Sequence, residues 1–119
     1  MPEHVHLMIL PALPDWPVSV VQRRLKGAFA HRVLERWREL DAPVLTRLCD
    51  GDGAQRFWQA GGGYDRNINS PEEYAEKIAY MHGNPVKRGL VAHPLDWKWS
   101  SARWYQGCRD GVLSMDGMD

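Results

Sequence analysis

Two histidines near the start of the chain have the spacing of a metal-binding pair. His4 and His6 lie in residues 4–10, where alternating side chains give way to a continuous apolar run, a pattern that predicts a strand. Residues two apart on a strand point to the same face, so both imidazoles could reach one ion. The spacing also fits two surface histidines, and that interpretation stays open.

A tyrosine and an amide one helical turn apart form a second group with possible chemistry. The stretch from Ser70 to about His82 begins with a capping serine followed by a proline, which predicts the start of a helix. Tyr80 falls on its polar side, and Asn84 follows four residues later. Tyr80 could be a nucleophile or an ordinary boundary residue, and Tyr64 is the rival nucleophile.

Other patterns predict the elements that must position these groups. Apolar residues at helical spacing predict a long amphipathic helix over about 18–40, with a capping box at Ser19-Val20-Val21-Gln22 and basic residues on its outer face. Phe57-Trp58-Gln59 suggests a short strand. We expect Gly83-Asn84-Pro85 to stop the second helix, because the residue before a proline disfavours helical backbone.

Length and charge indicate the general class of protein. With 119 residues, of which 44% are hydrophobic and 25% charged, we expect one domain over 1–119, with 106–119 as a loosely ordered acidic tail. The formal net charge is zero, so attraction to nucleic acid must come from local clusters of charge. Basic residues gather between positions 17 and 48.

Cysteine usage and hydropathy indicate the cellular setting. Cys49 and Cys108 form neither a metal-type motif nor a disulfide framework, which fits a reducing compartment. No stretch reads as an export signal or is long enough to cross a bilayer. We therefore expect a soluble cytoplasmic protein without a membrane partner.

Five motifs follow one another over nearly the whole chain. The most specific are the triplet His4-Val5-His6 and the block in which Tyr80 precedes Asn84-Pro85. Together the motifs resemble the REP-associated tyrosine transposases, relatives of the single-tyrosine HUH transposases. The stretches that carry the resemblance are 1–9, 26–27, 57–59 with 64–68, 80–91 and 96–101.

The resemblance implies a fold and a set of ligands. It implies an α+β, ferredoxin-like antiparallel sheet with helices on one face. In this family a strand and a helix precede the histidine strand, so we expect an N-terminally truncated version. His4, His6 and Asn84 would bind Mg²⁺ or Mn²⁺, and Tyr80 would attack a DNA phosphate.

The activity implied is that of a DNA-nicking transposase. The chain would be a metal-dependent single-strand endonuclease and strand transferase that acts on hairpin repeats through a 5′-phosphotyrosine intermediate. The alternative is an inactive remnant that still binds hairpin DNA. DNA is the expected partner, and a homodimer is possible. The cations expected to contact DNA are Arg23, Lys26, Arg66, Lys77, Lys87 and Arg88.

Overall fold

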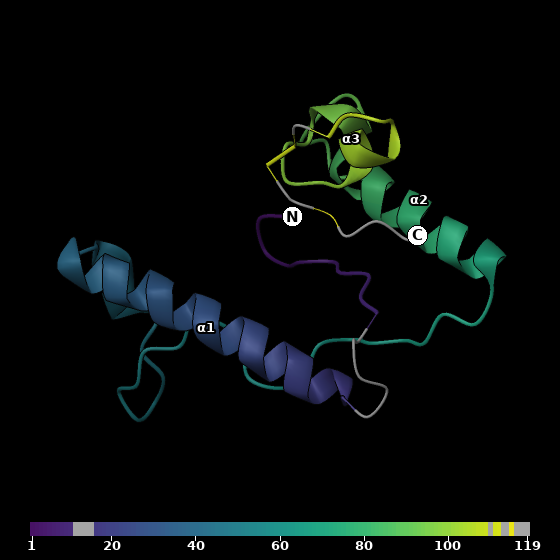
Figure 1. The fold of residues 1–119 in the computed structure, drawn as a ribbon. Helices are drawn as coiled ribbons and strands as arrows, with labels where there is room; N and C mark the ends of the chain where they lie inside the picture. Colours follow the sequence, from purple (N-terminus) through teal and green to yellow (C-terminus); the bar gives the residue numbers. More distant parts are fainter. Residues whose placement is uncertain (11–15, 110, 113–114, 116–119) are drawn as a thin grey trace. The chain divides into compact units, whose positions relative to one another are not determined.

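The protein consists of two compact units joined in one chain. A computed structural model describes residues 1–10, 16–109, 111–112 and 115 (Figure 1). Unit 1 combines 1–9 with 67–119, and unit 2 spans 10–66. The helices and 3-10 turns are α1 (Val18–Glu39), η1 (Pro43–Arg47), α2 (Pro71–Lys87), η2 (Pro94–Asp96) and α3 (Ala102–Tyr105).

The ferredoxin-like antiparallel sheet predicted from the sequence is wrong for the described part of the chain, which contains helices and loops but no strand. A strand needs a neighbour to pair its backbone N–H and C=O groups. The stretch 4–10 has the right side-chain pattern but finds no partner strand among the described residues. The one backbone bridge there joins Cys49 and Gln55 in a tight loop.

The long first helix is confirmed, although its predicted cap is not. α1 covers Val18–Glu39, close to the expected 18–40. The helix begins at Val18, directly after Pro17, so Ser19 lies inside the first turn. No side chain caps the helix start. At the other end Asp41 adopts a left-handed backbone with φ of 46°. The N–H of Ala42 then bonds the Trp37 carbonyl at 2.9 Å, which closes the helix end.

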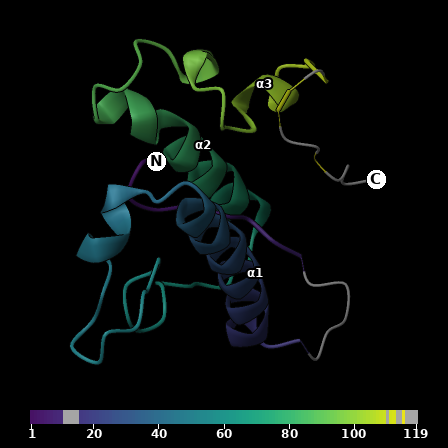
Figure 2. The same ribbon diagram turned by 90° about the vertical axis from the view of Figure 1, so that its left-hand side faces the viewer.

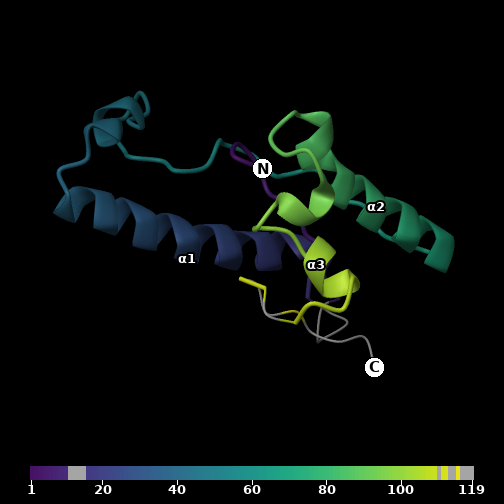
Figure 3. The ribbon, with the colours of Figure 1, turned by 90° about the horizontal axis from the view of Figure 1, so that it is seen from above.

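Unit 2 is held together by aromatic side chains packed on α1. Phe57 lies 5.2 Å from Phe29 and 5.6 Å from Trp37, measured between ring centroids. The indole N–H of Trp58 donates to the Lys26 carbonyl at 2.9 Å. The predicted strand at 57–59 is therefore a loop that supplies packing to the helix. Figure 3 shows α1 as one continuous helix, with η1 near its C-terminal end.

The start of α2 follows the sequence prediction. The Ser70 side chain accepts a hydrogen bond from the Glu73 backbone N–H at 3.1 Å, and Pro71 occupies the first helical position. The Glu73 carboxylate accepts from the backbone N–H of Asn69 at 3.0 Å. The serine half of a capping box is thus present, whereas the Glu73 carboxylate bonds the residue before the cap in place of the cap itself.

The predicted end of this helix is wrong, because α2 continues through Pro85 to Lys87. Its end is set one turn later by Gly89, whose φ of 66° suits glycine. The N–H of Gly89 bonds the Val86 carbonyl and that of Leu90 bonds the Pro85 carbonyl, both at 2.9 Å. This pair of bonds defines a Schellman cap. Asn84 is consequently a helical residue.

The small core of unit 1 forms where the chain turns back after α2 (Figure 2). Ile78 of α2 and Ala102 of α3 are buried there. His82 Nε2 lies 3.0 Å from Ser101 Oγ, and the hydroxyls of Tyr74 and Tyr105 share a hydrogen bond. Burial lowers the pKa of His82, whereas burial and Tyr74 raise the pKa of Tyr105 to about 12. Both shifts favour the neutral form of the side chain.

Two further expectations concern the chain's last residues and membranes. Much of the predicted acidic tail, 106–119, lies outside the described residues. Within the described part, no helix has both the length and the apolar character needed to cross a membrane.

Candidate functional site

The four residues predicted to carry the chemistry lie together in unit 1. His4 Nε2 and His6 Nε2 are 3.0 Å apart, and Asn84 Nδ2 lies 2.8 Å from His6 Nε2. The His6 ring also contacts the Tyr80 ring edge to face, with centroids 5.8 Å apart. His6 is therefore the centre of the group. The N-terminal segment and α2, distant in sequence, form the site between them.

The spacing of these groups fits a single divalent ion. Two ligands that bind at about 2.1 Å and at right angles lie about 3.0 Å apart, which matches the two imidazole nitrogens. A half-turn of the Asn84 amide exchanges its nitrogen for its oxygen, the atom that Mg²⁺ and Mn²⁺ prefer. His4, His6 and Asn84 would thus supply two nitrogen donors and one oxygen donor.

The electrostatic state of His6 suits this role. Burial by neighbouring groups, followed by the nearby His4 and the N-terminal amino group, lowers its pKa. The ring is therefore neutral near pH 7, and neutral imidazole is the form that ligates metal. Among the described residues, no group of three or more His, Cys, Asp or Glu side chains has an arrangement that could hold a metal ion. A metal bound here would therefore depend on the Asn84 amide as its third protein ligand.

Tyr80 has the accessibility that a nucleophile needs. Its side chain is 48% exposed, and it projects from the middle of α2, which fixes it relative to Asn84 one turn on. The Lys87 ammonium lies 5.3 Å from the centroid of the Tyr80 ring. The rival, Tyr64, is 90% exposed in a loop of unit 2. A helix holds a reactive group more firmly than such a loop does.

Glu3 is a neighbour of the site that sequence reasoning missed. Its Oε1 lies 2.5 Å from Arg88 Nη2 and 3.7 Å from His4 Nδ1. A backbone hydrogen bond, with further help from Arg88 and His4, lowers the pKa of the Glu3 carboxyl. Its position next to His4 is visible in the sequence. Its partner Arg88 could not be recognised, because no local pattern links residues so far apart.

The cations predicted to contact DNA fall in both units. On α2, Lys77 Nζ bonds Glu76 at 2.7 Å, and Arg88 pairs with Glu3. Lys87 is exposed beside Tyr80. In unit 2, Arg23 and Arg66 are exposed, and Lys26 Nζ lies 5.6 Å from the centroid of the Trp58 ring. Carboxylates thus already engage Lys77 and Arg88 of α2.

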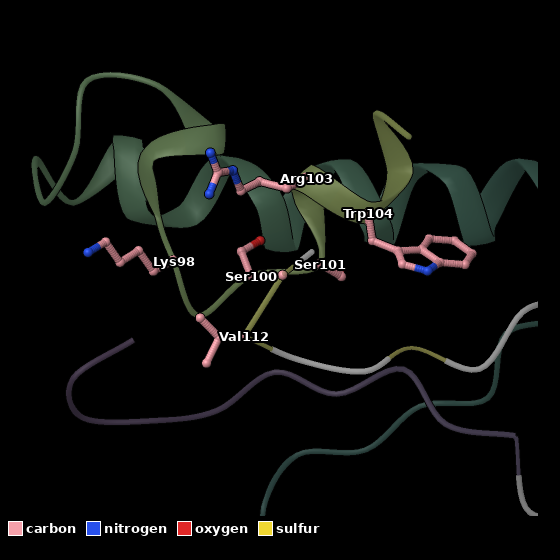
Figure 4. A pocket seen from close by; sticks show the side chains of 7 residues that line it. Lys98, Ser100, Ser101, Arg103, Trp104 and Val112 are labelled. Atoms are coloured by element: carbon pink, nitrogen blue, oxygen red, sulfur yellow. The ribbon is translucent and has the colours of Figure 1, made fainter. Parts of the chain in front are cut away.

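A separate hollow of about 250 Å³ lies beside α3 in unit 1. Figure 4 shows that Lys98 and Trp104, both on its lining, extend in opposite directions. The Ser100 hydroxyl accepts a hydrogen bond from the Ala102 backbone N–H, and the Ser101 hydroxyl bonds His82. The lining groups do not converge on one point, whereas His4, His6 and Asn84 do.

Two histidines, an amide and an exposed tyrosine lie together in unit 1 and form the candidate site for metal binding and nucleophilic attack. Comparison with known proteins gives two similar proteins. The chain is 26% identical over 101 residues to a Haemophilus influenzae protein named as a REP-associated tyrosine transposase, a match covering 85% of this chain and 54% of that protein. It is 32% identical over 66 residues to the REP-associated tyrosine transposase of Escherichia coli, covering 56% and 37%.

These matches confirm the resemblance seen in the motifs: the chain is similar to two proteins that carry the name REP-associated tyrosine transposase. The aligned regions amount to about half of the first relative and a smaller share of the second. No protein-family model and no solved structure matches the chain significantly.

Proposed function

We propose that the chain is a metal-dependent single-strand DNA endonuclease and strand transferase of the transposase type, with Tyr80 as its nucleophile. The observation that carries this proposal is the double contact of His6, which touches Asn84 through its Nε2 and Tyr80 through its ring. A structural histidine needs neither an exposed tyrosine nor a second imidazole at 3.0 Å. The names of the two relatives support the transposase part of this proposal.

The reaction would be a transesterification at a DNA phosphate. The Tyr80 oxygen, losing its proton, would form a bond to phosphorus while the bond from phosphorus to the 3′ oxygen breaks. The products are a 5′-phosphotyrosine and a free 3′ hydroxyl, which can reverse the step. A divalent ion held by His4, His6 and Asn84 would polarise the phosphate.

Other residues would hold the substrate. Lys87 is the α2 cation beside Tyr80, so its ammonium is suited to the oxygens of the attacked phosphate. Arg23 and Lys26 on α1, with Arg66, would bind phosphates further along a hairpin. Lys77 would contribute less, because Glu76 already neutralises much of its charge.

The test is covalent capture of DNA by the purified chain. Wild type, Tyr80→Phe and Tyr64→Phe are incubated with Mn²⁺ and a pool of hairpin oligonucleotides with randomised loops and flanks, then run on a denaturing gel. We expect an adduct with wild type and Tyr64→Phe and none with Tyr80→Phe. Adduct formation by Tyr80→Phe would contradict the assignment of the nucleophile.

The same samples separate cleavage from binding alone. If wild type shifts the pool on a native gel but forms no adduct with any metal, the chain is a hairpin-binding module and the enzyme proposal fails. The basic residues of α1 would then carry the whole function, and binding would weaken steeply with salt.

A further inference from the structure

Glu3 lies between the end of α2 and the first histidine of the candidate site. One carboxylate oxygen, Oε1, faces both Arg88 Nη2 at 2.5 Å and His4 Nδ1 at 3.7 Å. The other ring nitrogen of His4, Nε2, faces His6 Nε2 at 3.0 Å. The His4 ring therefore has a carboxylate on one side and the candidate metal site on the other.

This arrangement matters because a neutral imidazole carries only one N–H. Histidines that ligate metals commonly donate their second ring N–H to a carboxylate, which fixes the tautomer and the ring orientation. At 3.7 Å the contact between Glu3 and His4 is electrostatic, longer than a hydrogen bond. A carboxylate facing Nδ1 still favours the proton at that nitrogen and leaves the lone pair on Nε2.

The ion pair with Arg88 holds the exposed Glu3 carboxylate beside His4. The Glu3 side chain is 46% exposed and would otherwise sample several rotamers. Arg88 is the C-cap of α2, and its backbone N–H bonds the Asn84 carbonyl at 3.0 Å. The ion pair thus ties Glu3, and through it His4, to the helical turn that carries Asn84.

We propose that Glu3 is a positioning residue that sets the tautomer and orientation of His4 for metal binding, and that Arg88 holds Glu3 in place. The inference rests on the metal site of the proposed function. It assigns Arg88 to the construction of that site, so its guanidinium is not primarily a DNA contact.

The first test is the affinity of the full chain for Mn²⁺, measured by isothermal titration calorimetry without DNA. Glu3→Gln should weaken binding by roughly 10-fold to 100-fold, the usual effect of losing such a carboxylate. Arg88→Gln should weaken it less, and the double variant should lose less than the product of the two single effects. Glu76→Gln, which removes a paired carboxylate elsewhere on α2, is the matched control and should change nothing.

The second test reports the tautomer itself. The ¹⁵N chemical shifts of the His4 ring in the metal-free chain, at alkaline pH, should show the proton on Nδ1 in wild type and a mixture in Glu3→Gln. A merely structural role for Glu3 would leave this ratio unchanged.

The outcomes separate this inference from the function on which it rests. If wild type binds no Mn²⁺, the metal site fails and the inference falls with it. If wild type binds Mn²⁺ and Glu3→Gln binds it equally well with the same tautomer ratio, only the role of Glu3 is overturned. Circular dichroism of each variant checks that the helices are intact.

Discussion

Unit 1 and unit 2 are built from different kinds of contact. In unit 1, polar side chains far apart in sequence meet: His6 bonds Asn84 across 78 positions, and Glu3 pairs with Arg88. In unit 2, aromatic rings from the loop after a long helix pack on that helix. Unit 1 therefore holds the candidate site, whereas unit 2 consists of a packed basic helix and the loops around it.

The largest effect should come from removing the histidine at the centre of unit 1. His6→Ala should reduce Mn²⁺ affinity by roughly 100-fold or more, because it deletes a ligand and the contact that faces Tyr80. His31→Ala makes the same change on α1 of unit 2, where the ring is exposed and pairs only weakly with Glu35. If calorimetry finds that both variants lose Mn²⁺ affinity equally, the metal site is not specific to unit 1.

A smaller effect is expected for the lysine beside the tyrosine. Lys87→Gln should slow adduct formation at saturating DNA about 10-fold, because it removes a charge near the attacked phosphate. Lys87→Arg should restore most of the rate. Lys77→Gln is the control, since Glu76 already engages that lysine. If single-turnover assays give equal rates of adduct formation for Lys87→Gln and Lys77→Gln, Lys87 does not assist the reaction.

The packing of unit 2 can be tested at the half-buried indole of Trp58. Trp58→Phe deletes the hydrogen bond to the Lys26 carbonyl and should lower the free energy of unfolding by about 1 kcal/mol. Trp99→Phe makes the same change at a side chain that is 65% exposed and should cost under about 0.5 kcal/mol. Urea denaturation measures both. A larger loss for Trp99→Phe would show that the indole bond does not stabilise unit 2.

The smallest effect concerns the acid sensitivity of a loop in unit 2. The Arg56 side chain, followed by the backbone N–H groups of Ala54 and Asp52, lowers the pKa of Asp50. A lowered pKa means that the ionised carboxylate stabilises the loop above its unfolded pKa of about 3.9. That stabilisation is lost as pH falls through the lower, folded value.

Nuclear magnetic resonance can follow this loss through the amide of Ala54. Its chemical shift should titrate with a midpoint below about pH 3.9 in wild type and show no such step in Asp50→Asn. Asp52→Asn should keep the wild-type midpoint. A midpoint above the unfolded value would mean that the carboxylate does not stabilise the folded loop.

Sequence patterns predict those features that depend on near neighbours. The span of α1 follows from helical spacing, and the start of α2 follows from Ser70 and Pro71. The grouping of His4 and His6 with Asn84 came from the family motifs, since strand spacing alone left two surface histidines as an alternative. The structure adds the distances between these groups.

Features that depend on distant partners could not be predicted in the same way. The pattern of 4–10 predicts a strand, but pairing requires a second strand that the described residues do not provide. Pro85 predicts a helix end, yet the glycine that permits a Schellman cap is Gly89, and α2 continues past Pro85 to Lys87. The Glu3–Arg88 ion pair leaves no periodic signal at all.

The central claim is that Tyr80 reacts while held beside the His4, His6 and Asn84 group. The most direct measurement is mass-spectrometric mapping of the peptide that carries DNA after capture with Mn²⁺. The account predicts one modified residue, Tyr80, and no modification when the metal is chelated. A DNA adduct on Tyr64, or an adduct on Tyr80 that forms equally well with the metal chelated, would contradict it.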